Sequence, residues 1–125
     1  MNDSVIAILL GRKDSKGIRD KNIMPILGKP AFMYPLIAAE NSKYITDIFL
    51  STDHQDIINK VKESDVNLVN RPDYLCTDEA LFEDALIHAY NQAVKLLSSK
   101  PKYVVVLMCN AVTVNSDIID MYRKR

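Results

Sequence analysis

Short apolar runs alternate along this chain with longer segments in which apolar residues recur every three or four positions. Runs rich in aliphatic residues predict β-strands, because a buried parallel strand presents apolar side chains to both faces of a sheet. The predicted strands span residues 5–10, 48–51, 67–69 and 103–108, and the predicted helices span residues 32–42, 55–63 and 79–97, with a last helix beginning near Ser116 or Asp117. Strands that alternate with helices indicate an α/β fold with a mainly parallel sheet.

The order of these elements predicts which strands are neighbours. Right-handed crossovers and a Rossmann-like order place the first strand, residues 5–10, beside the fourth strand, residues 103–108. The fourth strand is apolar enough to be central in the sheet. Residues 25–30, which hold a glycine and two prolines, are expected to be irregular. The predicted fold is therefore a three-layer, Rossmann-like α/β fold in one domain, residues 1–125.

Charge is concentrated in the segment after the first strand, residues 11–22, which holds five Lys or Arg residues and two Asp residues. This segment leaves the carboxyl end of a predicted parallel strand, where α/β sheets bind ligands. Backbone N–H groups near its two glycines and fixed positive side chains suit a polyphosphate. The Walker-type P-loop and the dinucleotide glycine fingerprint are both absent from it. A solvated basic loop is the alternative, and Arg12, Lys16 and Lys21 are the candidate cations.

Composition limits the class of ligand. Sixteen Lys and Arg residues balance sixteen Asp and Glu residues, so the formal net charge is zero. Nucleic-acid and anionic-membrane binders have a basic excess, which argues against both as partners. No apolar run approaches the roughly twenty residues that span a bilayer, and the N-terminus lacks a signal-peptide pattern. Cys76 and Cys109 have neither metal-site nor disulfide-framework spacing, and Cys109, at the end of an apolar strand, is expected to be a buried thiol. These features predict a cytoplasmic protein with a small anionic ligand.

A set of short motifs occurs in a fixed order along the chain. They are Arg12, Ser15-Lys16-Gly17, Lys21-Asn22-Ile23, Leu27-Gly28-Lys29-Pro30, Ser51-Thr52-Asp53, Arg71-Pro72 and Thr77-Asp78. In this order they resemble the acylneuraminate cytidylyltransferases, which make CMP-sialic acids and related CMP-activated nonulosonic acids. More distantly, the chain is similar to the CMP-Kdo synthetases. The resemblance covers essentially the whole chain, and the ordered set is more specific than any single motif.

The resemblance implies roles for the residues that match. Arg12, Lys16 and Lys21 would be catalytic, because they would hold the triphosphate of CTP and stabilise the leaving pyrophosphate. Arg71 would help to read the cytosine. The full set of implied nucleotide-binding residues is Leu10, Gly11, Ser15, Asn22, Arg71 and Asn110. Mg2+ is the implied cofactor, and no metal ligand is assigned in this chain because the family's metal-binding aspartates fall beyond its last residue.

Some positions depart from the family's pattern. Lys13 and Asp14 stand where glycine is usual, and Met108 stands where a glutamine would contact the acceptor sugar. Asn110 lies near a metal-binding aspartate of the Kdo enzymes, and an amide is a poorer Mg2+ ligand than a carboxylate. Family members are also longer, so the chain is expected to be truncated, with most dimer-forming contacts and Mg2+ ligands beyond Arg125.

Other chemistry-bearing residues receive structural interpretations. Asp53, at the end of the second strand, is interpreted as a cap for the next helix, with ribose binding as the alternative. Thr77 or Asp78 is expected to cap the longest helix. His54 is expected in a loop and His88 on a helix face, neither of them catalytic.

The leading hypothesis is a nucleotidyltransferase that transfers CMP from CTP to the anomeric hydroxyl of a sialic-acid-like sugar acid and releases pyrophosphate. The resemblance also implies a homodimer. A non-catalytic nucleotide-binding or assembly domain is the alternative. A phosphoacceptor receiver is disfavoured, because such a module needs acidic residues after the first strand and that segment is mainly basic. The acceptor stays open among sialic, legionaminic, pseudaminic and Kdo-type acids.

Overall fold

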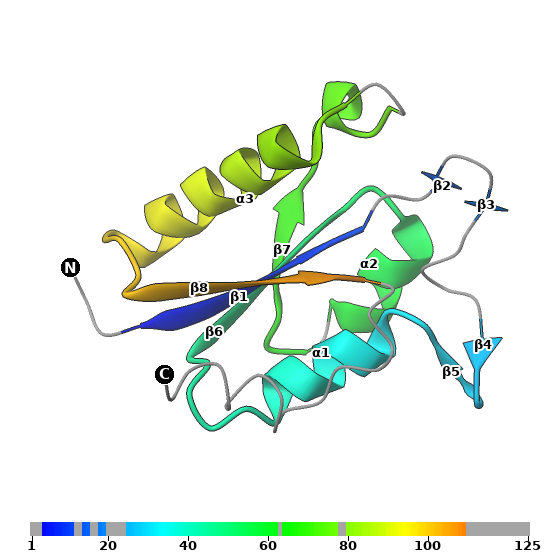
Figure 1. The fold of residues 1–125 in the computed structure, drawn as a ribbon, viewed down its shortest axis with the longest axis horizontal. Helices are drawn as coiled ribbons and strands as arrows, with labels where there is room; N and C mark the ends of the chain where they lie inside the picture. Colours follow the sequence, from blue (N-terminus) through cyan, green and yellow to red (C-terminus); the bar gives the residue numbers. More distant parts are fainter. Residues whose placement is uncertain are drawn as a thin grey trace.

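The computed structural model describes residues 4–11, 25–62, 64–77 and 80–109, together with the backbone of residues 14–15 and 18–19. The main sheet contains β1 (Val5–Leu10), β6 (Asp47–Thr52), β7 (Asn67–Asn70) and β8 (Tyr103–Met108). The described helices are α1 (Met33–Glu40), α2 (Gln55–Val61), α3 (Phe82–Leu97) and the short 3-10 helix η1 (Asp73–Leu75) (Figure 1). Two small hairpins precede α1: β2 (Asp14–Ser15) pairs with β3 (Ile18–Arg19), and β4 (Pro25–Ile26) pairs with β5 (Lys29–Pro30).

The main sheet is parallel and has the strand order β7-β6-β1-β8. β1 pairs with β6 on one side and with β8 on the other, which confirms that the first and last predicted strands are neighbours. All six residues of β1 are buried, as its continuous apolar sequence predicts. The chain builds the sheet from β1 toward β7 and then returns to the other side of β1. The strand order therefore reverses between β1 and β8, where open α/β sheets form a ligand crevice.

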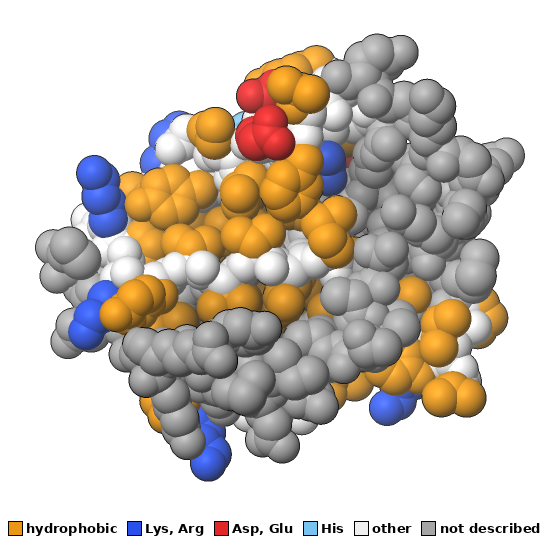
Figure 2. All heavy atoms as spheres, viewed as in Figure 1, with side chains coloured by type: hydrophobic (Ala, Val, Ile, Leu, Met, Phe, Trp, Pro, Cys, Tyr) orange, Lys and Arg blue, Asp and Glu red, His pale blue; other side chains and the backbone are white. Residues whose placement is uncertain are grey.

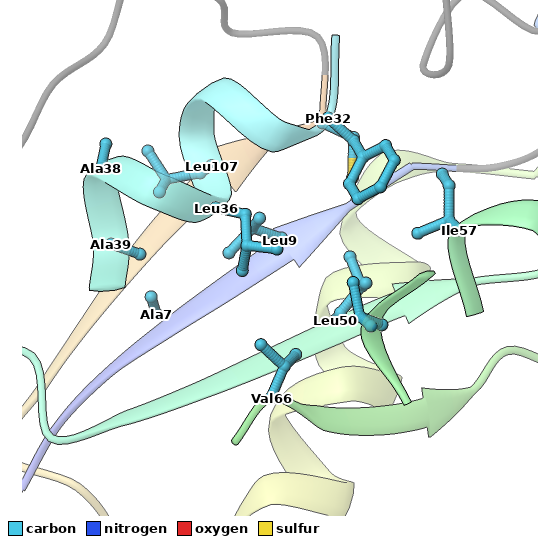
Figure 3. Close-up of a cluster of buried hydrophobic side chains, with 12 residues drawn as sticks. Ala7, Leu9, Phe32, Leu36, Ala38, Ala39, Leu50, Ile57, Val66 and Leu107 are labelled. Carbon is cyan, nitrogen blue, oxygen red and sulfur yellow. The ribbon is translucent and has the colours of Figure 1, made fainter. Parts of the chain in front are cut away.

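Helices cover both faces of the sheet. α1 and α2 lie on one face and α3 lies on the other (Figure 1). Alternate residues of β1 enter different cores, because successive side chains of a strand point to opposite faces. Ala7 and Leu9 pack with Leu36 of α1 and Ile57 of α2, as Figure 3 shows. Ile6, Ile8 and Leu10 pack on the opposite face with the α3 side chains Ala89 and Ala93. This arrangement confirms the predicted three-layer, Rossmann-like fold class.

The residues of α3 that face the sheet are small. They are Ala85, Ala89 and Ala93, all buried. The helix begins at Phe82, later than the predicted start at residue 79, and its N-cap Leu81 makes no side-chain cap hydrogen bond. The prediction that Thr77 caps this helix is wrong, because the Thr77 carbonyl instead accepts a hydrogen bond from the Ala80 N–H (3.2 Å) in a turn before the helix. Asp78, the other predicted cap, lies outside the described residues.

Among the described strands β8 pairs with β1 alone, and the central position expected for it stays a prediction. Four of its side chains are 37–47% exposed: Tyr103, Val104, Val106 and Met108. Figure 2 shows hydrophobic side chains gathered on this face of the molecule. An apolar run predicts a strand that can be buried, but it does not predict how many strands pair with it.

The segment from residue 25 to residue 30 is ordered as the hairpin β4–β5, although an irregular chain was expected. Leu27 and Gly28 form its tip and both have positive φ, 50° and 87° respectively. Positive φ at both central residues matches the twist of a two-residue hairpin turn. The Tyr34 hydroxyl donates a hydrogen bond to the Ile26 carbonyl and so ties the hairpin to α1.

Candidate functional site

The carboxyl ends of the parallel strands meet at one edge of the sheet. Gly11 follows β1, Asp53 follows β6, Arg71 follows β7 and Cys109 follows β8. Backbone hydrogen bonds continue past the strand ends: the Gly11 N–H donates to the Ser51 carbonyl (3.2 Å), and the Cys109 N–H donates to the Leu10 carbonyl (2.9 Å). Backbone hydrogen bonds therefore hold the end of β1 to β6 on one side and to β8 on the other.

Leu10 and Gly11 are buried at this point of reversal, and Leu10 is only 2% exposed. The Gly11 N–H is already paired with β6, and the Leu10 carbonyl already accepts one hydrogen bond. A carbonyl oxygen has two lone pairs, so Leu10 can accept one further bond from a ligand. These two residues can thus form the floor of a site at the edge, and any charge must come from other segments.

Arg71 supplies a positive charge at the same edge. Its Nε donates a hydrogen bond to the Leu75 carbonyl (3.0 Å), so its side chain folds back over the turn that follows β7. The pKa of the Cys109 thiol is raised to about 12 by burial, and the Arg71 charge opposes that rise. Cys109 follows β8, at the far side of the sheet from β7. The Arg71 charge is therefore close enough to influence the thiol at the end of β8.

Cys76 lies beside Arg71 and Asp53. Its thiol donates toward the carbonyls of Pro72 (3.3 Å) and Arg71 (3.8 Å), within the same turn. Burial, the largest cause, and the negative charge of Asp53 raise the pKa of Cys76 to about 11, while the Arg71 charge lowers it. Two opposite charges from the ends of neighbouring strands thus lie close to one sulfur atom.

Three of the predicted nucleotide-binding residues lie at this edge with described side chains or backbone: Leu10, Gly11 and Arg71. Ser15 is described by its backbone alone, in β2, where it pairs with Ile18 of β3. The predicted catalytic residues Arg12, Lys16 and Lys21 and the predicted nucleotide ligands Asn22 and Asn110 lie outside the described residues. Their roles remain predictions.

The N-cap of α2 is His54 and not Asp53, so the capping prediction for Asp53 is wrong, whereas His54 lies in the loop between β6 and α2, as predicted. His54 Nδ1 accepts a hydrogen bond from the Asp56 N–H (3.3 Å), and the His54 N–H donates to Thr52 Oγ1 (3.0 Å). His54 is 3% exposed, whereas Asp53 is exposed. The imidazole of His54 therefore caps α2, because its Nδ1 accepts a hydrogen bond from a backbone N–H in the first turn of the helix. His88 lies on α3, as predicted.

The effect of the Asp53 charge on the pKa of Cys76 is a feature that the sequence analysis missed. The usable signal is topological, because both residues follow parallel strands that pair with each other, β6 and β7. A second missed feature is Ser51 at the end of β6, which is fully buried and whose Oγ has no hydrogen-bond partner among the described residues. Both features lie at or beside the edge that carries Arg71.

Within residues 4–11, 25–62, 64–77 and 80–109, no group of three or more His, Cys, Asp or Glu side chains could hold a metal ion. Magnesium is usually held by one or two carboxylates together with substrate phosphates. Asp53, directly after β6, is a carboxylate at this edge of the sheet. The described donor set therefore does not fit a resident Mg2+ ion. None of the described helices has the length and apolar character needed to cross a bilayer.

Curated proteins similar to this chain are cytidylyltransferases. The chain is 40% identical over 76 residues to a protein of Helicobacter pylori named pseudaminic acid cytidylyltransferase and UDP-2,4-diacetamido-2,4,6-trideoxy-beta-L-altropyranose hydrolase, covering 60% of this chain and 15% of that protein. It is 30% identical over 89 residues to the N-acylneuraminate cytidylyltransferase of Escherichia coli, covering 71% of this chain and 21% of the relative.

Solved structures with the same fold cover nearly the whole chain. A CMP:2-keto-3-deoxy-manno-octonic acid synthetase complexed with CTP matches 98% of this chain with a TM-score of 0.75 and 13% identity. A cytidylyltransferase from Leptospira borgpetersenii matches 98% of it with a TM-score of 0.71 and 19% identity. The chain spans 46% and 48% of these two structures, respectively.

A family model described as Cytidylyltransferase matches residues 6–108. The match begins at the second residue of β1 and ends at the last residue of β8, so it includes residues of every described strand of the main sheet and the strand-end residues Gly11, Asp53 and Arg71. The matched segment accounts for most of the chain, and the chain therefore belongs to the cytidylyltransferase family.

Proposed function

We propose that this chain is the nucleotide-binding part of an enzyme that transfers CMP from CTP to the anomeric hydroxyl of a sialic-acid-like sugar acid. In this reaction the sugar hydroxyl attacks the α-phosphorus, the new C–O–P linkage forms, and the bond to pyrophosphate breaks. Family membership and the names of the relatives support CTP and an acidic sugar as the substrates.

The observation that carries the proposal is the position of the Arg71 charge. Arg71 follows β7 at the same carboxyl edge of the sheet where Leu10 and Gly11 are buried at the end of β1. A nucleotide bound at the point of strand reversal would meet main-chain atoms from β1 and a fixed cation from the turn after β7. Nucleotidyl transfer depends mainly on positioning and charge neutralisation, so such fixed groups are suitable equipment.

The remaining roles follow from the family's motifs. Arg12, Lys16 and Lys21 would bind the triphosphate and stabilise the negative charge that develops on the leaving pyrophosphate. Ser15 and Asn22 would bind phosphate or ribose, and Asn110 would line the opposite wall of the crevice. We also propose, on family membership alone, that the complete protein uses Mg2+, works as a homodimer and acts in the cytoplasm.

Calorimetric titration of the full chain with CTP, ATP and GTP, with and without Mg2+, tests the proposal. We expect binding that is selective for CTP, because a site that reads the cytosine edge rejects purines by leaving its polar groups unpaired. Equal binding of the three nucleotides, or no binding, contradicts the proposal. CTP-selective binding without turnover would instead support a non-catalytic nucleotide-binding domain.

A further inference from the structure

We propose that the groove between β7 and α3 binds a small amphipathic carboxylate, that is, a molecule with an apolar body and one negative charge. The groove has a volume of about 460 Å³ and lies along β7, from Asn67 to Asn70. Sites for small molecules have volumes of roughly 300–1,000 Å³ and combine an apolar surface with a few polar groups. None of the residues that line the groove belongs to the predicted nucleotide site, so the proposal goes beyond the proposed function.

The two flanks of α3 carry different side chains, and the groove lies along one of them. Gln92, Lys95 and Leu96 line the groove. They share one flank, because residues three and four positions apart are neighbours on a helix. The partly buried residues of α3 that pack against the core lie on its other flank: Leu86, Tyr90 and Leu97. The flank toward β7 is therefore the one that leaves space over the sheet.

The floor of the groove is apolar. It contains Phe49 of β6 and Val69 of β7, which are 2% and 6% exposed. Both belong to the core cluster that packs against α3, so both side chains lie on the face of the sheet that this helix covers. Leu68 and Leu96 also line the groove, and they are among the exposed large hydrophobic residues. Covering such apolar surface with a ligand is favourable, because it removes the surface from water.

Polar groups in the groove provide hydrogen bonds and a single charge. The carboxamides of Asn67, Asn70 and Gln92 line it. Asn67 Nδ2 donates to the Ile48 carbonyl (3.1 Å), so its Oδ1 faces no competing donor from that bond. Lys95 is the one charged residue that lines the groove, and among the described residues it has no ion-pair partner. An ammonium group forms charge-assisted hydrogen bonds with a carboxylate, which favours a monoanion as the ligand.

The charged end of the groove lies away from the predicted nucleotide site. β7 and β8 are parallel and α3 connects them, so the helix runs opposite to the strands. Lys95, in the last turn of α3, therefore lies toward the start of the strands, whereas Arg71 follows the end of β7. We expect the carboxylate and CTP to bind independently.

Fluorescence titration of the full chain with 8-anilinonaphthalene-1-sulfonate, an aromatic monoanion, tests the charge of the site. N-phenyl-1-naphthylamine is the matched uncharged probe. We expect saturable binding of the anionic probe, and Lys95→Gln should weaken it about tenfold, the lower range for a hydrogen bond to a charged group. Lys95→Arg should retain the affinity, and the uncharged probe should bind the wild type and Lys95→Gln equally. Lys100→Gln is the control, because Lys100 does not line the groove.

Substitutions at Gln92 test the position of the probe without removing a packed side chain. Gln92→Lys should strengthen binding of the anionic probe, and Gln92→Glu should weaken it. Val106→Thr, on the exposed part of β8, should leave it unchanged. If Val106→Thr removes binding, or if the Gln92 and Lys95 variants bind the anionic probe like the wild type, the probe binds elsewhere and the proposal is wrong.

Competition identifies the apolar body of the ligand. Displacement of the anionic probe by octanoate indicates an aliphatic carboxylate, displacement by benzoate indicates an aromatic one, and 1-octanol should displace it less than octanoate does. If neither acid displaces the probe, the proposal is wrong. Saturating CTP should leave the probe bound, and displacement by CTP would overturn the site between β7 and α3. A chain that binds the probe as expected but does not bind CTP would contradict the proposed function alone.

Discussion

Strands β1 and β8 are both six residues long, both nearly pure aliphatic, and paired with each other along their whole length. Their environments differ sharply. β1 is buried at every position, whereas four side chains of β8 are more than a third exposed. β1 has a strand on each side and helices over both faces, while β8 has one neighbouring strand in the described sheet. The comparison shows that burial is set by neighbours, and apolar sequence only permits it.

The largest contrast should appear at a pair of residues that face each other across the two strands, Ile8 and Val106. Ile8 is fully buried and Val106 is 38% exposed. We expect Ile8→Ala to lower the free energy of unfolding by about 4 kcal/mol, because it leaves a cavity in a packed core. Val106→Ala should lower it by about 1 kcal/mol or less, the span of strand propensities. Urea denaturation of both variants measures the difference, and equal losses would contradict the difference in burial between the two residues.

β1 and β8 also differ in the charged residues that flank them. The cationic segment of residues 11–22 follows β1, whereas Lys102 precedes β8 at the opposite end of the sheet. We expect Lys16→Ala to reduce turnover about a hundredfold, the typical loss when one donor to a developing negative charge is removed. Lys21→Ala should behave similarly, and Lys102→Ala is the control with unchanged turnover. Kinetics with CTP and a sugar acid measure the effect, and full activity in both Lys16 and Lys21 variants would contradict the catalytic roles.

The hairpin β4–β5 extends the comparison to a region where backbone conformation, more than packing, decides stability. Leu27 is 95% exposed and has a φ of 50°, so its side chain gains little from burial while its backbone is strained. Asparagine tolerates this conformation better than leucine. We expect Leu27→Asn to raise the free energy of unfolding by about 1 kcal/mol.

Gly28→Ala is the matched test of the same turn. A Cβ at Gly28 would meet no atom within 4 Å, so any loss reports the φ of 87° alone. We expect a loss of about 1 kcal/mol, measured by the same denaturation. If both substitutions are neutral, backbone strain does not limit the stability of this hairpin.

The smallest effect at neutral pH should come from Cys109, which is fully buried although it directly follows the exposed strand β8. Burial raises the pKa of this thiol to about 12, against about 8.5 in an unfolded chain. The folded state therefore holds the proton in a pH range where the unfolded state releases it. The stabilising contribution is complete below about pH 8.5 and is lost as pH rises toward 12. Comparing wild type with Cys109→Ala across this range should show a steeper loss of stability in the wild type.

Agreement between sequence and structure is best where local pattern and burial coincide. The continuous apolar run of β1 and the apolar stripe of helical period in α3 identified their elements, although the start of α3 was missed. The start was missed because Thr77 forms a turn with Ala80 before the helix begins at Phe82. The hairpin β4–β5 was missed because the left-handed conformation of Leu27 is unusual for a leucine.

The site residues that short motifs mark could also be predicted, whereas effects between residues distant in sequence could not. The resemblance singled out Arg71 and the backbone of Leu10 and Gly11 without any knowledge of distance. The effect of Asp53 on the pKa of Cys76 could not be predicted, because the two residues are far apart in sequence and follow strands, β6 and β7, that pair only in the folded sheet. The preference of aspartate for helix N-caps predicted that Asp53 caps α2, but the buried imidazole of His54 makes the cap.

The sequence by itself determined the class of fold, the adjacency of the first and last strands, and the family, since these depend on apolar periodicity and on motifs in a fixed order. Only the tertiary structure decided that β8 is half exposed in the described sheet, that His54 caps α2, and that the charges of Asp53 and Arg71 act on the thiol of Cys76. Periodicity records which face of an element avoids water. Which groups come into contact across the sheet depends on how all the elements fill space together.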